Sequence, residues 1–165
     1  MATTVASPVF VDTNILIYAR LATSALHHVA VDTLDRLAAA GVELWTSRQI
    51  LREYLASITR PTTVTPPLPV SVVIADVRGF ESRFRVAEDG SLVTAELLRL
   101  ISAVTVQGKQ IHDANVVATM LAHNVPILLT HNTADFVRYA ASINVLPLVP
   151  PASPAPPVPP PPGAP

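Results

Sequence analysis

Short apolar runs alternate with segments of helical periodicity along most of this chain, and that order constrains the fold more than any other feature. The predicted strands are residues 9–11, 42–46 and 125–129, with 84–86 and 145–149 as candidates for two more. The segments with apolar side chains at helical spacing are 13–20, 26–40, 48–60, 92–104, 112–123 and 133–140. Strands that alternate with helices form a parallel sheet with helices on both faces, so we predict an α/β fold.

Two further segments need separate treatment. Residues 70–84 contain a run of apolar residues that fits a strand, but the spacing of Val70, Val73 and Val77 fits a helix better. The last sixteen residues, 150–165, include ten prolines and no charge, and proline interrupts both helices and central strands. We therefore predict one folded domain over residues 1–149 and a Pro-rich disordered tail over 150–165.

Composition excludes several classes of protein. The formal net charge of −1 argues against a basic coat for bulk nucleic-acid binding, although it allows a local basic patch. The absence of cysteine excludes disulfides and thiolate metal sites. No signal-peptide pattern or membrane-length apolar run is found, so a cytoplasmic protein without a membrane segment is expected. The apolar content of 50% suggests a surface that is buried by a partner.

Four carboxylates lie near the points where predicted strands end or helices begin, and they are Asp12, Glu53, Asp113 and Asp135. Asp12 directly follows the first strand, and ligands of open parallel sheets bind beyond the carboxyl ends of the strands. Asp113 begins the apolar stripe of its own helix, which places its carboxylate on the inward face. Clustered carboxylates repel each other unless a cation lies between them. The pattern therefore indicates a hard divalent metal and phosphodiester chemistry.

Each acid also has a simpler interpretation. Asp12 and Asp135 could be helix caps, Glu53 a solvated helix residue and Asp113 a first-turn acid. Four such residues at one edge of one sheet favour a shared site. The chain has neither a Gly-rich phosphate loop nor a Gly-x-Ser-x-Gly turn, which argues against nucleotide-binding and serine-hydrolase chemistry.

Four segments occur in a characteristic order, namely FVDTNIL at 10–16, ILREY at 50–54, IHDA at 111–114 and LTHNTADF at 129–136. In this order and spacing the chain resembles the PIN-domain nucleases, and within them the VapC-type toxins of bacterial toxin–antitoxin pairs. The resemblance implies a PIN-like, Rossmann-like parallel sheet between helices. It also implies cleavage of single-stranded or loop RNA with Mg²⁺ or Mn²⁺, a homodimer, and a small antitoxin protein as partner.

The resemblance also assigns residues by position. The acids that would bind metal and catalyse cleavage are Asp12, Glu53, Asp113 and Asp135, with Thr130 and Asn132 as polar helpers. Arginines on or just after the Glu53 helix, Arg48, Arg52 and Arg60, are expected to contact RNA phosphates, and Arg20 and Lys109 are expected near the same opening.

Three alternative functions remain at this stage. The first is a PIN-type RNA-processing nuclease that is not a toxin. The second is a phosphatase in which Asp12 attacks phosphorus, although Asn14 stands where such enzymes usually carry a general acid. The third is a non-catalytic interaction module.

Overall fold

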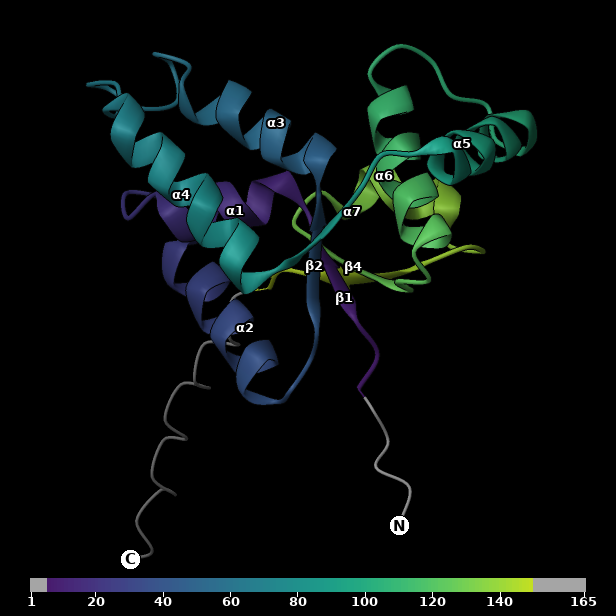
Figure 1. The fold of residues 1–165 in the computed structure, drawn as a ribbon, viewed down its shortest axis with the longest axis horizontal. Helices are drawn as coiled ribbons and strands as arrows, with labels where there is room; N and C mark the ends of the chain where they lie inside the picture. Colours follow the sequence, from purple (N-terminus) through teal and green to yellow (C-terminus); the bar gives the residue numbers. More distant parts are fainter. Residues whose placement is uncertain (1–5, 150–165) are drawn as a thin grey trace, which may run out of the picture.

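The centre of the molecule is a five-stranded parallel sheet in a computed structural model that describes residues 6–149 (Figure 1). The strands are β1 (Val9–Val11), β2 (Leu44–Ser47), β3 (Arg85–Ala87), β4 (Ile127–Thr130) and β5 (Asn144–Pro147), and they lie side by side in the order β3-β2-β1-β4-β5. All neighbouring strands are parallel. The chain leaves β1 toward β2 and later returns to place β4 on the other side of β1. This reversal is a switch point, where open parallel sheets bind their ligands.

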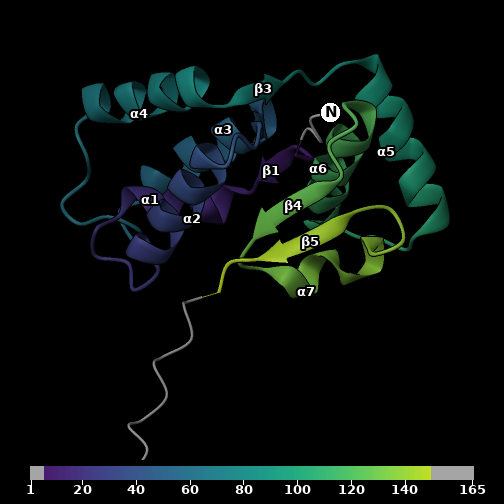
Figure 2. The same cartoon turned by 90° about the horizontal axis from the view of Figure 1, so that it is seen from below.

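Helices cover both faces of the sheet. They are α1 (Thr13–Arg20), α2 (His27–Ala39), α3 (Arg48–Ile58), α4 (Val70–Arg83), α5 (Ser91–Ala103), α6 (Gln110–Ala122) and α7 (Thr133–Phe136), and α7 continues into a 3-10 turn at Val137–Tyr139. The first four helices lie on one side of the sheet and α5, α6 and α7 on the other (Figures 1 and 2). From β1 to β3 each new strand is added on one side of β1, and β4 and β5 are added on the other side. Because crossovers between parallel strands are right-handed, the connecting helices of these two halves lie on opposite faces of the sheet. The predicted α/β fold with a parallel sheet between helices is confirmed.

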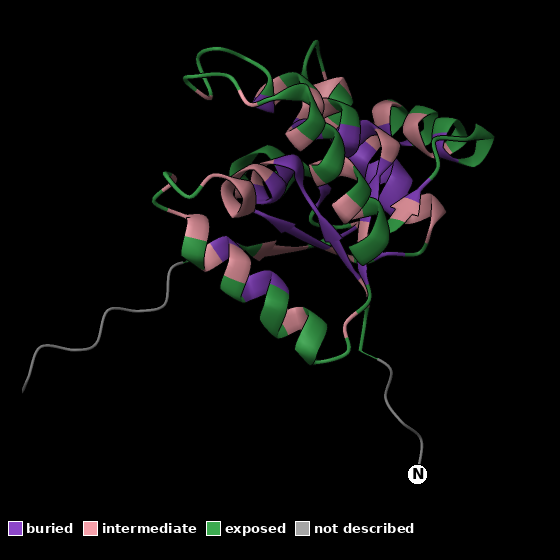
Figure 3. Cartoon of the chain, turned by 60° about the vertical axis from the view of Figure 1, so that its left-hand side comes forward, coloured by how far each residue is buried: buried purple, intermediate pink, exposed green. Residues whose placement is uncertain are grey.

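The core fills the space between the sheet and both layers of helices. Phe10 and Val11 of the central strand β1 are fully buried, as expected for a strand covered on both faces. Ile15 and Leu16 of α1 and Val117 of α6 are buried as well. Figure 3 shows the buried residues along the strands and the exposed residues on the outer faces of the helices. Burial of each such aliphatic side chain stabilises the fold by about 1.5–3 kcal/mol.

Local signals explain where several helices begin and end. Ser47 is the predicted N-cap of α3, and its Oγ accepts a hydrogen bond from the Ile50 N–H at 3.2 Å. Gly41, with φ +73°, follows the end of α2 in the left-handed region that glycine adopts readily. Most of the ambiguous segment at 70–84 forms the helix α4, in which Val73 is buried and Val70 and Ile74 are exposed, and Phe84 follows in an extended conformation. The predicted tail at 150–165 lies outside the described residues. None of the helices in the described part is long and apolar enough to cross a membrane.

Candidate active site

Asp12 lies at the carboxyl end of β1, where it also caps α1. Its Oδ1 accepts the N–H of Thr13 at 2.7 Å. Its Oδ2 accepts hydrogen bonds from Asn14 Nδ2 and Thr130 Oγ1, both at 2.6 Å. Burial raises the pKa of Asp12, and the hydrogen bonds from Thr130 and Thr13 oppose this rise. Asp12 is therefore the helix cap that the simpler interpretation requires, and also a fixed, desolvated carboxylate at the switch point.

Thr130, at the end of β4, links Asp12 to the neighbouring loop. While its hydroxyl donates to Asp12, its Oγ1 accepts from Asn14 Nδ2 at 3.1 Å and from the Asn132 N–H at 3.0 Å. Asn14 Oδ1 in turn accepts the N–H of His131 at 3.0 Å. The predicted helper Thr130 thus contacts Asp12 directly. Asn132 contributes its main-chain N–H, and its side chain makes no hydrogen bond within residues 6–149.

Glu53 projects from α3 and is half-buried. Thr13 Oγ1 donates to its Oε2 at 2.8 Å, and Gln49 Nε2 donates to its Oε1 at 2.7 Å. Because Thr13 follows Asp12 directly in the chain, this contact joins the first two acids of the predicted four. Both oxygens of Glu53 are oriented by neutral donors, so the carboxylate stays in place without a cationic partner.

Asp113 lies in the first turn of α6 and is half-buried. Burial, followed by the charges of Asp135, Asp12 and Glu53, raises its pKa to about 6. Glu53, Asp113 and Asp135 line the same groove, together with Thr13, which follows Asp12 directly. Asp135 lies in the first turn of α7 and is exposed. The structure therefore brings the four predicted acids together.

The acids lie in an open groove of about 820 Å³ between α3 and the start of α6. Its lining includes Glu53, Asp113 and Asp135, and also three basic residues, Arg52, Arg60 and Lys109. Arg52 has Asp89 as a distant partner at 3.7 Å, which leaves its guanidinium largely available. The groove therefore combines three basic side chains with three carboxylates.

Two of the arginines expected at this opening lie elsewhere. Arg48 does not line the groove, because its guanidinium donates to Glu88 at 2.9 Å and also pairs with Glu81. Arg20 pairs with Asp76 of α4 at 2.7 Å. Sequence spacing placed both near the groove, but acidic partners on other elements turn them away from it.

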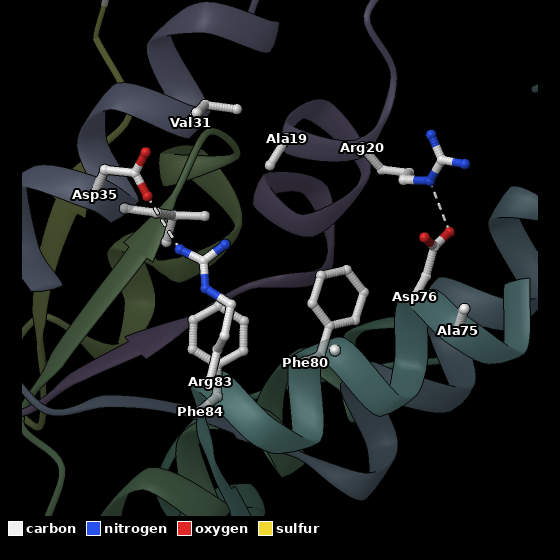
Figure 4. Close-up of a pocket in the computed structure, with 11 residues that line it drawn as sticks. Ala19, Arg20, Val31, Asp35, Ala75, Asp76, Phe80, Arg83 and Phe84 are labelled. Carbon is white, nitrogen blue, oxygen red and sulfur yellow. Dashed lines mark hydrogen bonds and ion pairs between the residues drawn. The ribbon is translucent and has the colours of Figure 1, made fainter. Parts of the chain in front are cut away.

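A second pocket, of about 250 Å³, lies between α1, α2 and α4 (Figure 4). Apolar side chains such as Val31, Phe80 and Phe84 line it. Its charged residues are engaged in the ion pairs Arg20–Asp76 and Arg83–Asp35. None of the four acids borders this pocket.

The donor set of the groove fits a hard divalent ion, since carboxylate oxygens are the ligands that Mg²⁺ and Mn²⁺ prefer. Among residues 6–149, however, no three His, Asp or Glu side chains are spaced to hold one ion directly. Mg²⁺ usually binds through one or two carboxylates and keeps several waters. An open groove lined by separate carboxylates suits that mode of binding better than a closed cage of protein ligands.

The comparison with protein families decides what this arrangement is. The PIN domain family matches residues 9–142. The chain belongs to the PIN domain family. PIN domains are nucleases and generally use divalent metals, so the acid groove at the switch point is the expected place for their chemistry.

Solved structures with the same fold include toxin–antitoxin complexes. A DNA-bound VapBC from Salmonella typhimurium has 16% identity and a TM-score of 0.65, over 87% of this chain and 99% of that one. VapBC2 from Rickettsia felis, bound to a promoter DNA fragment, has 17% identity and a TM-score of 0.63, over 84% and 97%. The sarcin-ricin loop cleaving toxin VapC20 from Mycobacterium tuberculosis has 21% identity and a TM-score of 0.55, over 73% and 86%. At these identities the similarity concerns the fold. The comparison with curated proteins gives no match.

Thr13, Gln49 and Asn115 were not singled out from the sequence, and Asn14 was considered only for the phosphatase alternative. Thr13 and Asn14 could have been suspected, because they follow Asp12 directly in the motif. Gln49 stands one helical turn before Glu53, and Asn115 two residues after Asp113, so only proximity in sequence could have indicated them.

Proposed function

We propose that this PIN domain is a Mg²⁺- or Mn²⁺-dependent endoribonuclease that acts as a toxin and is neutralised by a small antitoxin protein. One observation supports the proposal: Glu53, Asp113 and Asp135 line one groove, and the buried Asp12 lies behind it, next to the groove residue Thr13. Acids held this close gain most from a bound cation.

In this proposal Asp12, Glu53, Asp113 and Asp135 together bind one or two divalent ions, with one or two carboxylates bound directly to an ion and the others bound through its water molecules. When bound, such an ion lowers the pKa of a water molecule and stabilises charge on the attacked phosphate. The protein supplies orientation. Thr130 and Asn14 fix the carboxylate of Asp12 by hydrogen bonds of 2.6 Å. Thr13 and Gln49 donate hydrogen bonds to the two oxygens of Glu53, so its carboxylate is also held in one orientation.

The basic border of the groove supports a polyanionic substrate. Arg52 and Arg60 on the α3 side and Lys109 on the α6 side are exposed and line the same groove as the acids. They would hold the phosphates that flank the scissile bond, while the acids act on the bond itself. We expect single-stranded or loop RNA, and the RNA-cleaving VapC20 toxin with the same fold supports that choice.

The partners belong to the proposal as well. Solved structures of this fold include VapBC complexes, which supports a small antitoxin for this chain. The apolar content of 50% supports a homodimer with further buried surface. The phosphatase alternative is disfavoured, because the Asn14 amide donates to Asp12 and Thr130 and cannot serve as a general acid.

The test is metal-dependent cleavage of RNA by the purified chain. We expect cleavage with Mn²⁺ or Mg²⁺, none with EDTA, and none for Asp113→Asn. The matched control is Asp32→Asn, which alters an exposed acid on α2 and should cleave normally. Metal-independent cleavage, or full activity of Asp113→Asn, would reject the assigned site.

The toxin role needs a second experiment. The chain is co-expressed with the product of the adjacent small gene, and the purified pair is assayed for RNA cleavage and for mass by light scattering. Inhibition within a stable complex supports the toxin. An active, monomeric chain that no neighbouring product inhibits would favour the RNA-processing nuclease instead.

A further inference from the structure

Gln49 makes the hydrogen bonds that cross the groove between α3 and α6. It stands in the first turn of α3, four residues before Glu53, and only 6% of it is exposed. Its Nε2 donates to Glu53 Oε1 at 2.7 Å and to the main-chain oxygen of His112 at 3.0 Å. Its Oε1 accepts from Asn115 Nδ2 at 2.6 Å. In the described part of the chain, hydrogen bonds between α3 and α6 are made by this side chain.

The partners of Gln49 determine which way its amide faces. Glu53 and the His112 carbonyl present acceptors to the amide nitrogen, whereas Asn115 presents a donor to the amide oxygen. Rotation of the amide by half a turn would place an oxygen against a carboxylate and an –NH₂ group against another –NH₂ group. Each of these contacts is repulsive, so a single orientation is stable.

The hydrogen bonds of Gln49 connect two helices whose carboxylates repel each other. Glu53 belongs to α3 and Asp113 to α6, and without a cation their carboxylates oppose close approach. A neutral amide between the helices holds them at a fixed spacing without adding charge to the cluster. Thr13 holds the other oxygen of Glu53 at 2.8 Å, so Gln49 completes the constraint on that carboxylate.

We propose that Gln49 is a positioning residue, which orients Glu53 and fixes the spacing between Glu53 and Asp113 for a divalent ion. This inference rests on the proposed function. Asn115 supports it indirectly, because its donor selects the active orientation of the Gln49 amide. Groups that orient metal ligands typically change metal affinity or activity by about 10–100-fold when they are removed.

The test measures binding of Mn²⁺ alone by titration calorimetry, so it does not depend on catalysis. Gln49→Met keeps the length of the side chain but removes its hydrogen bonds, and we expect the Kd for Mn²⁺ to rise about 10-fold or more. In RNA cleavage at saturating metal, kcat should fall while KM for RNA stays within about 2-fold, because the basic residues are untouched. The matched control is Gln107→Met, which alters an exposed glutamine outside the groove and should bind Mn²⁺ normally.

A second variant keeps the inference testable if Gln49→Met does not fold. Asn115→Ala leaves the contacts of Gln49 Nε2 with Glu53 and His112 in place but removes the donor to Gln49 Oε1, which loosens the side chain, so we expect a rise in Kd of about 3–10-fold. An unchanged Kd in folded Gln49→Met, or in Asn115→Ala where Gln49→Met fails to fold, would overturn the positioning role while the nuclease assignment stands. Absence of Mn²⁺ binding by the wild-type chain would instead overturn the nuclease assignment, and the positioning role with it.

Discussion

Replacement of Asp113 by Asn should make the metal-free protein more stable. Asp113 is half-buried among acids, and burial, followed by the charges of Asp135, Asp12 and Glu53, raises its pKa from 3.8 to about 6. A carboxyl group whose pKa is higher in the folded than in the unfolded state favours folding while it is protonated. Stability from this group is therefore complete below pH 3.8 and is lost as the pH rises toward 6. Asparagine carries no charge and avoids that loss.

The size of the effect follows from the same pKa values. The full difference corresponds to about 3 kcal/mol above pH 6. Asp113 borders an open groove, where solvent screens part of the repulsion, so about 1 kcal/mol is the realistic gain. For a domain of this length, that gain would raise the melting temperature by about 2–4 °C.

The assay is thermal unfolding in EDTA between pH 4 and pH 8, for wild type, Asp113→Asn and the exposed control Asp32→Asn. The advantage of Asp113→Asn should grow between pH 4 and about pH 6 and then remain constant. Saturating Mn²⁺ should reverse the order, because the ion stabilises the complete site more than the site lacking one acid. A gain that does not vary with pH, or a loss of stability at pH 7.5, would refute the idea that the acids repel one another.

Four further outcomes can be checked. Asp12→Asn should abolish cleavage and also lower stability by about 1–3 kcal/mol in urea unfolding, because its new –NH₂ would face donors that now bond to a carboxylate. Arg60→Gln should raise KM for RNA about 5–10-fold with little change in kcat, unlike the exposed Arg78→Gln outside the groove. Tyr139→Phe should be neutral or stabilise by up to about 1 kcal/mol in urea unfolding, since the buried hydroxyl has no hydrogen-bond partner in the described protein. Truncation after Val149 should leave melting temperature and cleavage nearly unchanged, and a large loss of either would contradict the proposed domain boundary.

Most of the fold was predictable because its signals are local. Periodicity identified β1 and α1, and the cap at Ser47 marked the start of α3. Residues 70–84 remained ambiguous because a run of three apolar residues satisfies either a strand or a helix. The structure has a helix there, which packs Val73 into the core, and such packing depends on segments distant in the sequence.

The acids of the site could also be predicted from the sequence, but the contacts of their neighbours could not. Asp12 and Asp135 could be found because they follow β1 and β4, whose carboxyl ends meet at one edge of the sheet. Asp113 was indicated by the apolar stripe of its own helix, and Glu53 by the order of the four sequence segments. The positions of Arg48 and Gln49 could not be found in this way. Arg48 is held by Glu88, forty residues away, and Gln49 by Asn115, sixty-six residues away. Pairings of that kind depend on side-chain rotamers that no local pattern encodes.

The contact between Asp12 and Thr130 has a consequence for biosynthesis, because 118 positions separate these residues. Strand β4, which carries Thr130, is inserted beside β1 late in synthesis, and Asp113 and Asp135 also emerge from the ribosome late. Chains emerge N-terminal end first at about 5–20 residues per second. A nascent chain that has released only the first hundred residues therefore holds Asp12 and Glu53 without the other two acids. The proposed ribonuclease would thus stay incomplete beside its own ribosome until α7 has been released.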